Sequence, residues 1–255
     1  MKRSNRYYLS YRIGMLLILL LFSILIINKS NNFDLISVFS STKELPIYSV
    51  ERQDKKIAIS FDAAYGDEYT LDILDTLDKY KIKSTFFLVK FWIDKYPHQV
   101  KEIYNRGHEI GNHSATHPNM STLSREQIIE EINSTGQAIF ELTQEEPILF
   151  RPPFGDYNDL LIQTCRELGY YPIQWDIDSL DWKELGVQSV VDTVTRNVES
   201  GSIVLFHNNA KYIKEYLPIV IERLLEKGYE IVPVSELIHF DNYTIDNSGR
   251  QIPNN

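Results

Sequence analysis

From Lys56 onward, short β-rich runs alternate with helix-like stretches, and this rhythm restricts the fold more than any other feature of the sequence. Seven apolar runs have strand character: KIAISFD, KSTFFLV, HEIGNH, ILFRPP, YYPIQWDID, SIVLFHN and YEIVPVSEL. The stretches between them carry apolar residues at helical spacing, and several end on a glycine, as helices commonly do. Strands that alternate with helices predict a parallel sheet covered by helices. We therefore expect one barrel-like α/β domain rather than two smaller domains.

Polar side chains gather at the points where these strands end. Five strand ends carry groups capable of catalysis: Asp62, His113 with His117, Arg151, Asp176 with Asp178 and Asp181, and His207. In α/β barrels, chemistry takes place on the loops that leave the carboxyl ends of the strands. The connections at the opposite ends, KYKIK, NRGHE, TQEEP, ESGS and EKGYE, carry no comparable pattern. This asymmetry between the two rims predicts an enzyme.

The stretch HSATHPN places His113 and His117 four positions apart, within a loop or a single turn. Two imidazoles at this spacing can chelate one divalent metal ion, and the alternative is a pair of surface or capping histidines. Because Asp62 also stands at a strand end, a metal site is the better interpretation. Such a metal would act as a Lewis acid and lower the pKa of bound water. Asp62 is then available as a general base and His207 as a general acid.

Two further segments supply a rigid arginine and aromatic rings. In RPPFG, two prolines fix the backbone after Arg151, so its guanidinium is suited to orient a carboxylate such as Asp62. In WDIDSLDW, period-2 spacing predicts that Asp176 and Asp178 point the same way. The two tryptophans of this segment would form an apolar floor for an acyl group or a sugar face, or alternatively fill the barrel.

Together, these clusters resemble the polysaccharide deacetylase family, which is carbohydrate esterase family 4 and has the NodB homology domain. Five motifs of that family are matched in order, over roughly residues 56–238, by SFDAAYG, HSATH, RPPFG, DSLDW and LFH. The first of them resembles the sporulation-type branch of the family, in which Phe-Asp-x-x-Trp/Tyr-Gly occurs at this point. Any one motif is weakly specific, whereas five in register are highly specific.

The resemblance implies a distorted (β/α)7-type barrel that removes acetyl groups from glycans with a divalent metal, often zinc. The implied catalytic residues are Asp62 as general base, His207 as general acid, Arg151 and Asp181; the implied metal ligands are His113 and His117; the implied substrate-binding residues are Pro153, Phe154, Trp182 and Leu205. In this scheme Arg151 orients the base, and Asp181 tunes the arginine or the acid. Trp182 and Leu205 would line the acetyl pocket.

One position departs from the family pattern. The second aspartate of the first motif, which is the third metal ligand of the family, falls at Ala63, whose methyl group cannot bind a cation. Asp67 or Glu68 could supply a ligand instead, or could simply begin the next helix, where acids are favoured. Three functions follow. The first is a metal-dependent deacetylase of peptidoglycan-like N-acetylated glycan outside the cytoplasm, and the second is a degenerate deacetylase that binds glycan without catalysis. The third is an O-acetyl esterase on a plant-type polysaccharide, which shares the mechanism and differs only in substrate.

The charge of the chain restricts the class of binding partner. The first 30 residues hold five basic residues and no acid, so the remaining chain has 21 basic and 35 acidic residues. A body this acidic is a poor candidate for binding a nucleic-acid backbone, and nothing in it indicates a particular oligomeric state.

The single cysteine, Cys165, excludes an intramolecular disulfide. It lies on an apolar helical stripe, which favours a buried thiol over a nucleophile.

The amino-terminal region has membrane character. Residues 13–27 contain no charged residue and follow several basic ones. This pattern favours an uncleaved, single-pass membrane anchor with the remaining chain outside the cytoplasm, over a cleaved secretion signal and a secreted protein. A buried core helix is the least favoured interpretation. The expected organisation is an anchor or signal segment (1–29), a tether (30–55), a deacetylase domain (56–240) and a flexible tail (241–255).

Overall fold

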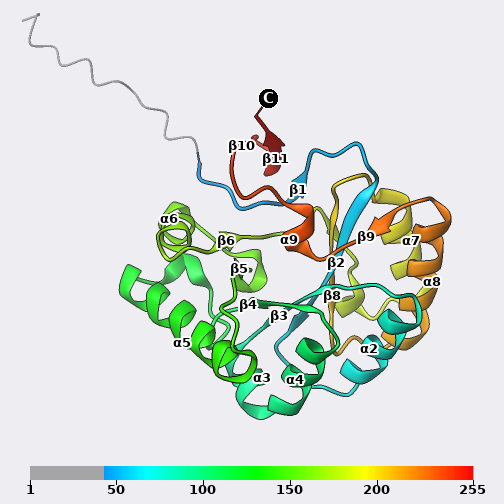
Figure 1. Cartoon of the computed structure of the whole chain (residues 1–255), viewed down its shortest axis with the longest axis horizontal. Helices are drawn as coiled ribbons and strands as arrows, with labels where there is room; N and C mark the ends of the chain where they lie inside the picture. The colour runs from blue at the N-terminus through cyan, green and yellow to red at the C-terminus, as the bar shows by residue number, and fades with distance from the viewer. Residues whose placement is uncertain (1–42, 255) are drawn as a thin grey trace, which may run out of the picture. The chain divides into compact units, whose positions relative to one another are not determined.

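The computed structural model describes residues 43–254, and the described residues from Glu44 onward form one compact unit. Its centre is a curled sheet of parallel strands in the order β6-β5-β4-β3-β2-β8-β7, with β9 paired to β2 (Figure 1). These strands are β2 (Lys56–Ala63), β3 (Thr85–Leu88), β4 (Glu109–Asn112), β5 (Leu149–Phe150), β6 (Tyr171–Pro172), β7 (Ile177–Asp178), β8 (Ile203–His207) and β9 (Glu230–Ile231). The predicted single α/β domain with a parallel sheet is confirmed.

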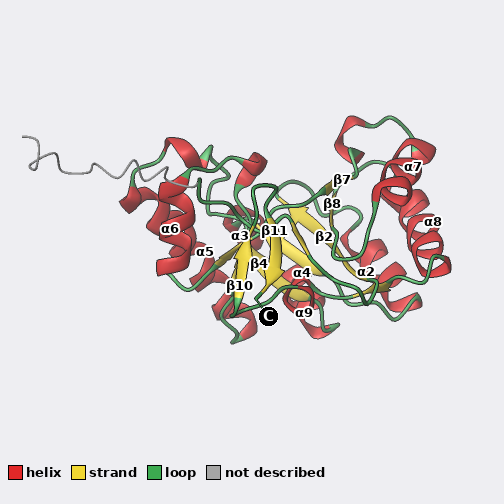
Figure 2. Cartoon of the chain, turned by 90° about the horizontal axis from the view of Figure 1, so that it is seen from above, coloured by secondary structure: helices red, strands yellow, loops and turns green. Residues whose placement is uncertain are grey.

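Helices follow most of the strands and pack around the sheet (Figure 2). They are α2 (Thr70–Lys79), α3 (Lys90–Lys95), α4 (Pro97–Asn105), α5 (Arg125–Thr143), α6 (Asp159–Glu167), α7 (Val187–Asn197), α8 (Ile213–Glu226) and α9 (Val234–Leu237). The start of α5 follows from the sequence, because Ser124 and Gln127 form a capping box in which each side chain bonds to the backbone of the other. Gly107, Gly169 and Gly228 follow α4, α6 and α8 with positive φ, as predicted.

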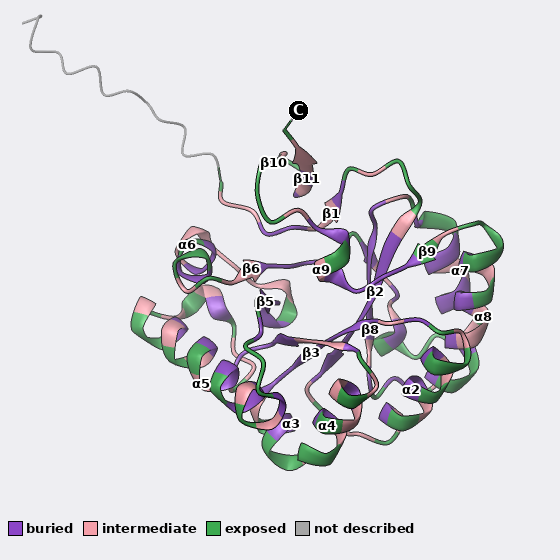
Figure 3. Cartoon of the chain, in the orientation of Figure 1, coloured by how far each residue is buried: buried purple, intermediate pink, exposed green. Residues whose placement is uncertain are grey.

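Alternate residues of β2 face different layers of the domain. Phe61 and Ala63 belong to the core cluster between the sheet and the helices. Ala58 belongs to a second cluster, on the concave side of the sheet, together with Phe87. Asp62 stands directly beside Phe87 in the parallel register, so its side chain shares the concave side. In Figure 3 the long central strands are buried, and the helices expose the faces that point away from them. One side of the sheet therefore packs against the helices, and the other carries Asp62 beside a second apolar cluster.

The sheet does not close on itself, since β6 and β7 are not paired with each other among the described residues. Residues 47–50 cross this seam. The Ile47 N–H donates to the Pro172 carbonyl at 2.8 Å, and the Val50 N–H donates to the Gly201 carbonyl at 2.9 Å. Gly201 has a φ of +87°, and a Cβ there would lie 1.7 Å from the Val50 carbonyl oxygen. The barrel is therefore open, and a preceding segment of the chain fills the opening.

Two predicted boundaries are corrected by this arrangement. The tether predicted for residues 30–55 is wrong for its last part, because Ile47 and Val50 are completely buried in the seam. The flexible tail predicted for 241–255 is also wrong for most of its length. Strands β1 (Ser49–Val50), β10 (Tyr243–Ile245) and β11 (Arg250–Pro253) form a separate sheet in the order β1-β11-β10. The buried side chain of Gln251 bonds twice to the backbone of His239, at 2.7 and 2.6 Å.

The predicted membrane anchor at 13–27 lies outside the described residues and stays a prediction. Within residues 43–254, no helix has both the length and the apolar character needed to cross a membrane.

Cys165 is completely buried in α6, where burial raises the pKa of its thiol. The interpretation of this cysteine as a packing residue rather than a nucleophile is confirmed.

Candidate active site

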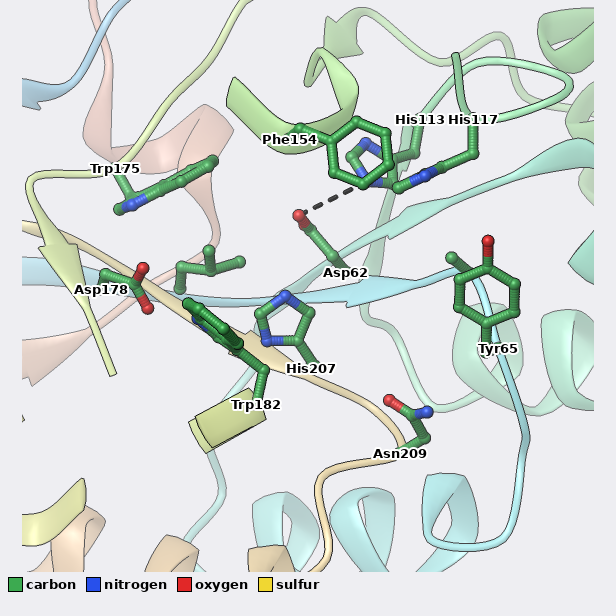
Figure 4. A pocket seen from close by; sticks show the side chains of 12 residues that line it. Asp62, Tyr65, His113, His117, Phe154, Trp175, Asp178, Trp182, His207 and Asn209 are labelled. Atoms are coloured by element: carbon green, nitrogen blue, oxygen red, sulfur yellow. Dashed lines mark ion pairs between the residues drawn. The ribbon is translucent and has the colours of Figure 1, made fainter. Parts of the chain in front are cut away.

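A cavity of about 460 Å³ opens at the carboxyl ends of the central strands (Figure 4). Seven of the residues that the family resemblance implies line it: Asp62, His113, His117, Phe154, Trp182, Leu205 and His207. Two further predicted residues, Arg151 and Asp181, are buried and bond to residues of the lining. Side chains from strand ends far apart in the sequence thus meet in one place, as a parallel sheet allows.

Asp62 is a buried carboxylate held by a rigid guanidinium. Its side chain is 8% exposed, and fully buried Arg151 donates from Nη1 to Asp62 Oδ1 at 2.8 Å. The guanidinium carbon lies 4.0 Å from the centre of the Phe87 ring, and Nη2 donates to the Gln174 carbonyl at 3.1 Å. Burial alone would raise the pKa of Asp62, but the charge of Arg151 and its hydrogen bond outweigh burial and lower that pKa. Asp62 is therefore an ionised proton acceptor at neutral pH.

His207 is held by a carboxylate in a matching way. Its Nδ1 lies 2.7 Å from Asp181 Oδ1, and its backbone N–H donates to Asp181 Oδ2 at 2.9 Å. The Tyr216 hydroxyl also donates to Asp181 Oδ2, at 2.8 Å. Burial alone would lower the pKa of His207, but the hydrogen bond and charge of Asp181 outweigh burial and raise that pKa above 6.5. With Nδ1 bound to Asp181, Nε2 is the nitrogen of His207 that can deliver a proton.

The tautomer of His113 is set by the backbone. Its Nδ1 lies 2.7 Å from the carbonyl oxygen of Arg151, which can only accept, so Nδ1 carries the proton and Nε2 holds a lone pair. This Nε2 lies 3.5 Å from Asp62 Oδ2. Burial lowers the pKa of His113, so the contact joins a neutral imidazole to a carboxylate and is not an ion pair. Two atoms with lone pairs face each other here, and a bound cation would satisfy both.

His117 adds a second imidazole to this wall of the cavity. Its ring centre lies 5.0 Å from that of His113 and 4.4 Å from that of Phe154. Burial lowers the pKa of His117 to about 4, and its buried Nδ1 has no hydrogen-bond partner among the described residues. Two neutral imidazoles beside an ionised carboxylate form a donor set that suits a divalent cation. Even so, the described residues hold no group of three or more His, Cys, Asp or Glu side chains already placed to hold a metal ion.

Position 63, where the family has a third ligand, does not face the cavity. Ala63 is completely buried in the core between the sheet and the helices, whereas Ala64 lines the cavity. Neither Asp67 nor Glu68 lines it. Asp67 accepts a hydrogen bond from Gln99 Nε2 at 3.0 Å, just before α2. These two acids therefore lie just before a helix and outside the lining of the cavity.

Two expectations about the lining are corrected. Pro153 is buried and does not line the cavity; it begins a 3-10 turn (Pro153–Gly155) in which Phe154 has a φ of 59° and is 67% exposed. Asp176 and Asp178 do not point the same way, because the chain bends at residue 176 and β7 is only two residues long. Asp178 lines the cavity, whereas Asp176 accepts hydrogen bonds from Ser202 and Ile203, both at 2.7 Å.

Sequence reasoning missed several groups at this site. Tyr65 and Asn209 line the cavity, and the Tyr65 ring centre lies 6.2 Å from that of His117. Their positions, just after Asp62 and His207, are the signal that could have identified them. Tyr216 lies in α8, and nothing in its local sequence connects it to Asp181. Only the packing of α8 against the sheet shows that connection.

Comparison with known proteins agrees with this site. Residues 49–173 match the family model described as polysaccharide deacetylase. The chain is 38% identical over 198 residues to the peptidoglycan-N-acetylglucosamine deacetylase of Bacillus cereus, which covers 76% of this chain and 92% of that protein. It is 33% identical to the peptidoglycan-N-acetylmuramic acid deacetylase PdaC of Bacillus subtilis, over 74% of this chain and 40% of that longer protein.

Among solved structures, the chain is similar to a CE4 family pseudoenzyme from Bacillus anthracis. The identity is 33% and the TM-score 0.73, over 75% of this chain and 68% of that one. A mutant of that pseudoenzyme with restored enzymatic activity has 34% identity and the same TM-score of 0.73, over 75% of this chain and 70% of that one. Active and inactive proteins therefore share this fold.

Proposed function

The chain belongs to the polysaccharide deacetylase family, and we propose that it is a hydrolase that removes acetyl groups from N-acetylated cell-wall glycan. The proposal depends on one observation: an ionised carboxylate held by Arg151 and an imidazole held by Asp181 face one cavity. A protein that only binds glycan does not require a fixed proton acceptor beside a fixed proton donor. The Bacillus cereus relative, named for peptidoglycan, supports a peptidoglycan-like substrate.

The reaction is the hydrolysis of an amide. Asp62 takes a proton from a water molecule, and the oxygen of that water forms a bond to the carbonyl carbon of the acetamido group. His207 then donates its Nε2 proton to the sugar nitrogen while the carbon–nitrogen bond breaks. The products are acetate and a glycan with a free amino group. Throughout, Arg151 keeps Asp62 in place and Asp181 keeps His207 in place.

We further propose that the enzyme uses a divalent metal ion, with zinc the natural candidate for imidazole ligands. His113 and His117 would hold it, and the Asp62 carboxylate lies beside His113. Such an ion would polarise the acetyl carbonyl and lower the pKa of water. Because His113 Nδ1 donates to the Arg151 carbonyl, the backbone of the residue that orients the base also orients a metal ligand.

Aromatic and apolar side chains of the cavity suit a sugar that carries an acetyl group. Trp182 is 57% exposed and Phe154 67% exposed, so both rings are available to the faces of a sugar. Leu205 lines the same cavity while remaining almost completely buried, and it suits the acetyl methyl group. We place this chemistry outside the cytoplasm, at the membrane, because the apolar segment at 13–27 follows a basic start.

Ala63 supports a second candidate function, a glycan-binding protein without catalysis. The chain has an alanine where the family supplies a third metal ligand, and it is similar to a CE4 family pseudoenzyme. Metal affinity should be weaker with two protein imidazoles than with a complete ligand set. This alternative accounts for the glycan-facing aromatic residues but leaves the Asp62–Arg151 and His207–Asp181 pairs without a purpose.

Acetate release from peptidoglycan by the full-length protein, with and without added zinc, separates the two functions. We expect release that a strong chelator abolishes, that zinc restores, and that His207→Ala removes. A matched variant, Glu130→Gln on the exposed side of α5, should keep full activity. Binding to the polymer with no acetate from any N-acetylated glycan, even with metal added, would establish the second function instead.

A further inference from the structure

The loop that carries His113 and His117 has a strained backbone. Ser114 has a φ of +70° and His117 a φ of +57°, and residues other than glycine rarely adopt such values. Strain of this kind persists only where surrounding contacts hold the backbone in place. One of the two strained residues is itself an expected metal ligand, so the contacts that hold this loop also decide where the imidazole of His117 lies.

The middle of the loop is held by one side chain from another element, Glu131 of α5. Glu131 Oε2 accepts hydrogen bonds from the backbone N–H groups of Ala115 and Thr116, both at 2.8 Å. Glu131 Oε1 accepts from the Thr116 hydroxyl at 2.6 Å. The half-buried carboxylate thus receives three donors from two consecutive residues. Hydrogen bonds from backbone N–H groups to a carboxylate are stronger than those between neutral groups, so this contact can hold a strained loop.

The other contacts of the loop lie nearer its start or within it. The Ser114 N–H donates to Asn112 Oδ1 at 3.0 Å, and the Ser114 carbonyl accepts from the Lys90 N–H at 3.1 Å. The His117 N–H donates to Ser114 Oγ at 3.1 Å, a bond that would move with the loop. Among the described residues, Glu131 is therefore the connection between residues 115–116 and the rest of the domain.

The two imidazoles depend on this connection to different degrees. His113 is fixed from the opposite side, because its Nδ1 donates to the Arg151 carbonyl at 2.7 Å. The buried Nδ1 of His117 has no hydrogen-bond partner within residues 43–254. Its ring lies beside that of His113 in Figure 4, with 5.0 Å between the ring centres. The loop backbone, rather than a bond to the ring, therefore places His117.

We propose that Glu131 is a positioning residue that holds His117 beside His113 at the cavity. A consequence for metal affinity follows, and this consequence rests on the metal ion of the proposed function. With Ala63 in place of a third ligand, a loop that must be ordered when the ion binds would reduce an already limited affinity. Residues that orient metal ligands typically change metal affinity by about 10- to 100-fold.

Four variants separate a positioning role from an electrostatic one. Glu131→Gln keeps the length of the side chain and an acceptor oxygen but removes the charge. Glu131→Asp keeps the charge but is one methylene shorter, so its carboxylate no longer reaches the loop. Glu131→Ala removes both. Glu130→Ala is the matched control, because Glu130 is the exposed neighbour on the same helix and makes no hydrogen bond from its side chain to a described residue.

NMR of the metal-free, full-length protein tests the position of His117 directly. We expect Glu131→Ala and Glu131→Asp to shift the His117 imidazole resonances and to speed amide exchange at Ala115 and Thr116 by about tenfold or more. Glu131→Gln and Glu130→Ala should remain close to the native protein. The His113 resonances should change least, because the Arg151 carbonyl still fixes that ring. If Glu131→Ala does not fold, Glu131→Asp provides the same comparison.

Competition with a chromophoric chelator measures zinc affinity in the same proteins. The zinc dissociation constant should rise about tenfold in Glu131→Ala and Glu131→Asp, and should stay within about threefold of the native value in Glu131→Gln. The inference is overturned if Glu131→Ala leaves the His117 resonances unchanged, or if Glu131→Asp behaves like the native protein while Glu131→Gln does not. A native protein that binds no zinc would contradict the proposed metal ion, whereas the expected shifts of His117 would still support the role of Glu131.

Discussion

At the carboxyl rim of the sheet, Asp62 is matched by Arg151 and His207 by Asp181, whereas at the opposite, amino rim three glutamates share a second cavity without a cationic partner among the described residues. The first arrangement sets protonation states before any substrate arrives, as acid–base catalysis requires. At the amino rim the side chains of Glu145 and Glu146 are exposed to solvent. Internal pairing of charges thus distinguishes a rim built for reaction from a rim whose charges are solvated, even though both lie at the ends of the same strands.

Asp62→Asn should give the largest effect on activity, because it removes the proton acceptor at the carboxyl rim. We expect acetate release to fall by about 10²- to 10⁴-fold. Asp178→Asn is the matched control, since Asp178 lines the same cavity but has no guanidinium partner among residues 43–254. Initial rates of acetate release from peptidoglycan measure both variants. Equal losses for the two changes would mean that the cavity merely needs negative charge and that pairing with Arg151 carries no catalytic meaning.

Arg151→Met should give a large loss of stability. It leaves the buried Asp62 carboxylate without its guanidinium, and breaking one partner of a buried pair typically costs about 3–5 kcal/mol in the free energy of unfolding. Urea denaturation followed by tryptophan fluorescence measures the change. Adding Asp62→Asn should restore part of the stability, because the uncompensated charge is then removed. If the double variant is no more stable than Arg151→Met alone, the loss of stability does not come from the unpaired charge of Asp62.

Asp181→Asn should change the pH dependence of catalysis. The hydrogen bond and charge of Asp181 raise the pKa of His207, so the protonated acid persists to higher pH in the native enzyme. Without the carboxylate that pKa falls, and the alkaline limb of the pH profile of kcat should move to lower pH, with about a tenfold loss of rate at neutral pH. Tyr216→Phe removes only a donor to Asp181 and should not move the limb downward. A limb that stays in place in Asp181→Asn would exclude His207 as the titrating acid.

Glu146→Gln should give the smallest effect on activity, within about twofold of the native rate, because Glu146 is exposed to solvent at the opposite rim. Initial rates of acetate release from peptidoglycan measure this variant beside the native protein. A loss of acetate release as large as that of Asp62→Asn would show that the two rims act as a single site.

The carboxyl rim could be predicted from the sequence because its groups stand immediately after strands. The position of Arg151 before two prolines was enough to predict its contact with Asp62, and the structure shows that contact. The cavity at the amino rim could not be predicted, since Glu109 and Glu146 are far apart in the sequence and line it together only in the folded chain. Tyr216 was missed for the same reason, because a bond across 35 residues leaves no local pattern.

The parts of the fold that the sequence did not predict, strands β1, β10 and β11, lie in mixed polar segments. β1 has two residues and β10 three, which is too few to display the alternation that identifies a strand. The polar composition after residue 241 then indicates disorder, although backbone pairing with β1 orders this segment. The backbone pairing of β11 with β1 and β10, rather than the composition of the segment, therefore determines its structure.

The segment at 47–50 also determines how the domain would carry mechanical load. Ile47 bonds to the backbone of Pro172 and Gln174, and Val50 bonds to Gly201, so both edges of the opening hold the same short stretch. Tension transmitted along the chain from its amino end would reach these bonds before any catalytic strand. The hydrogen bonds of residues 47–50 would therefore break first. A pulling force on the amino end should detach this stretch well before it distorts the cavity around Asp62.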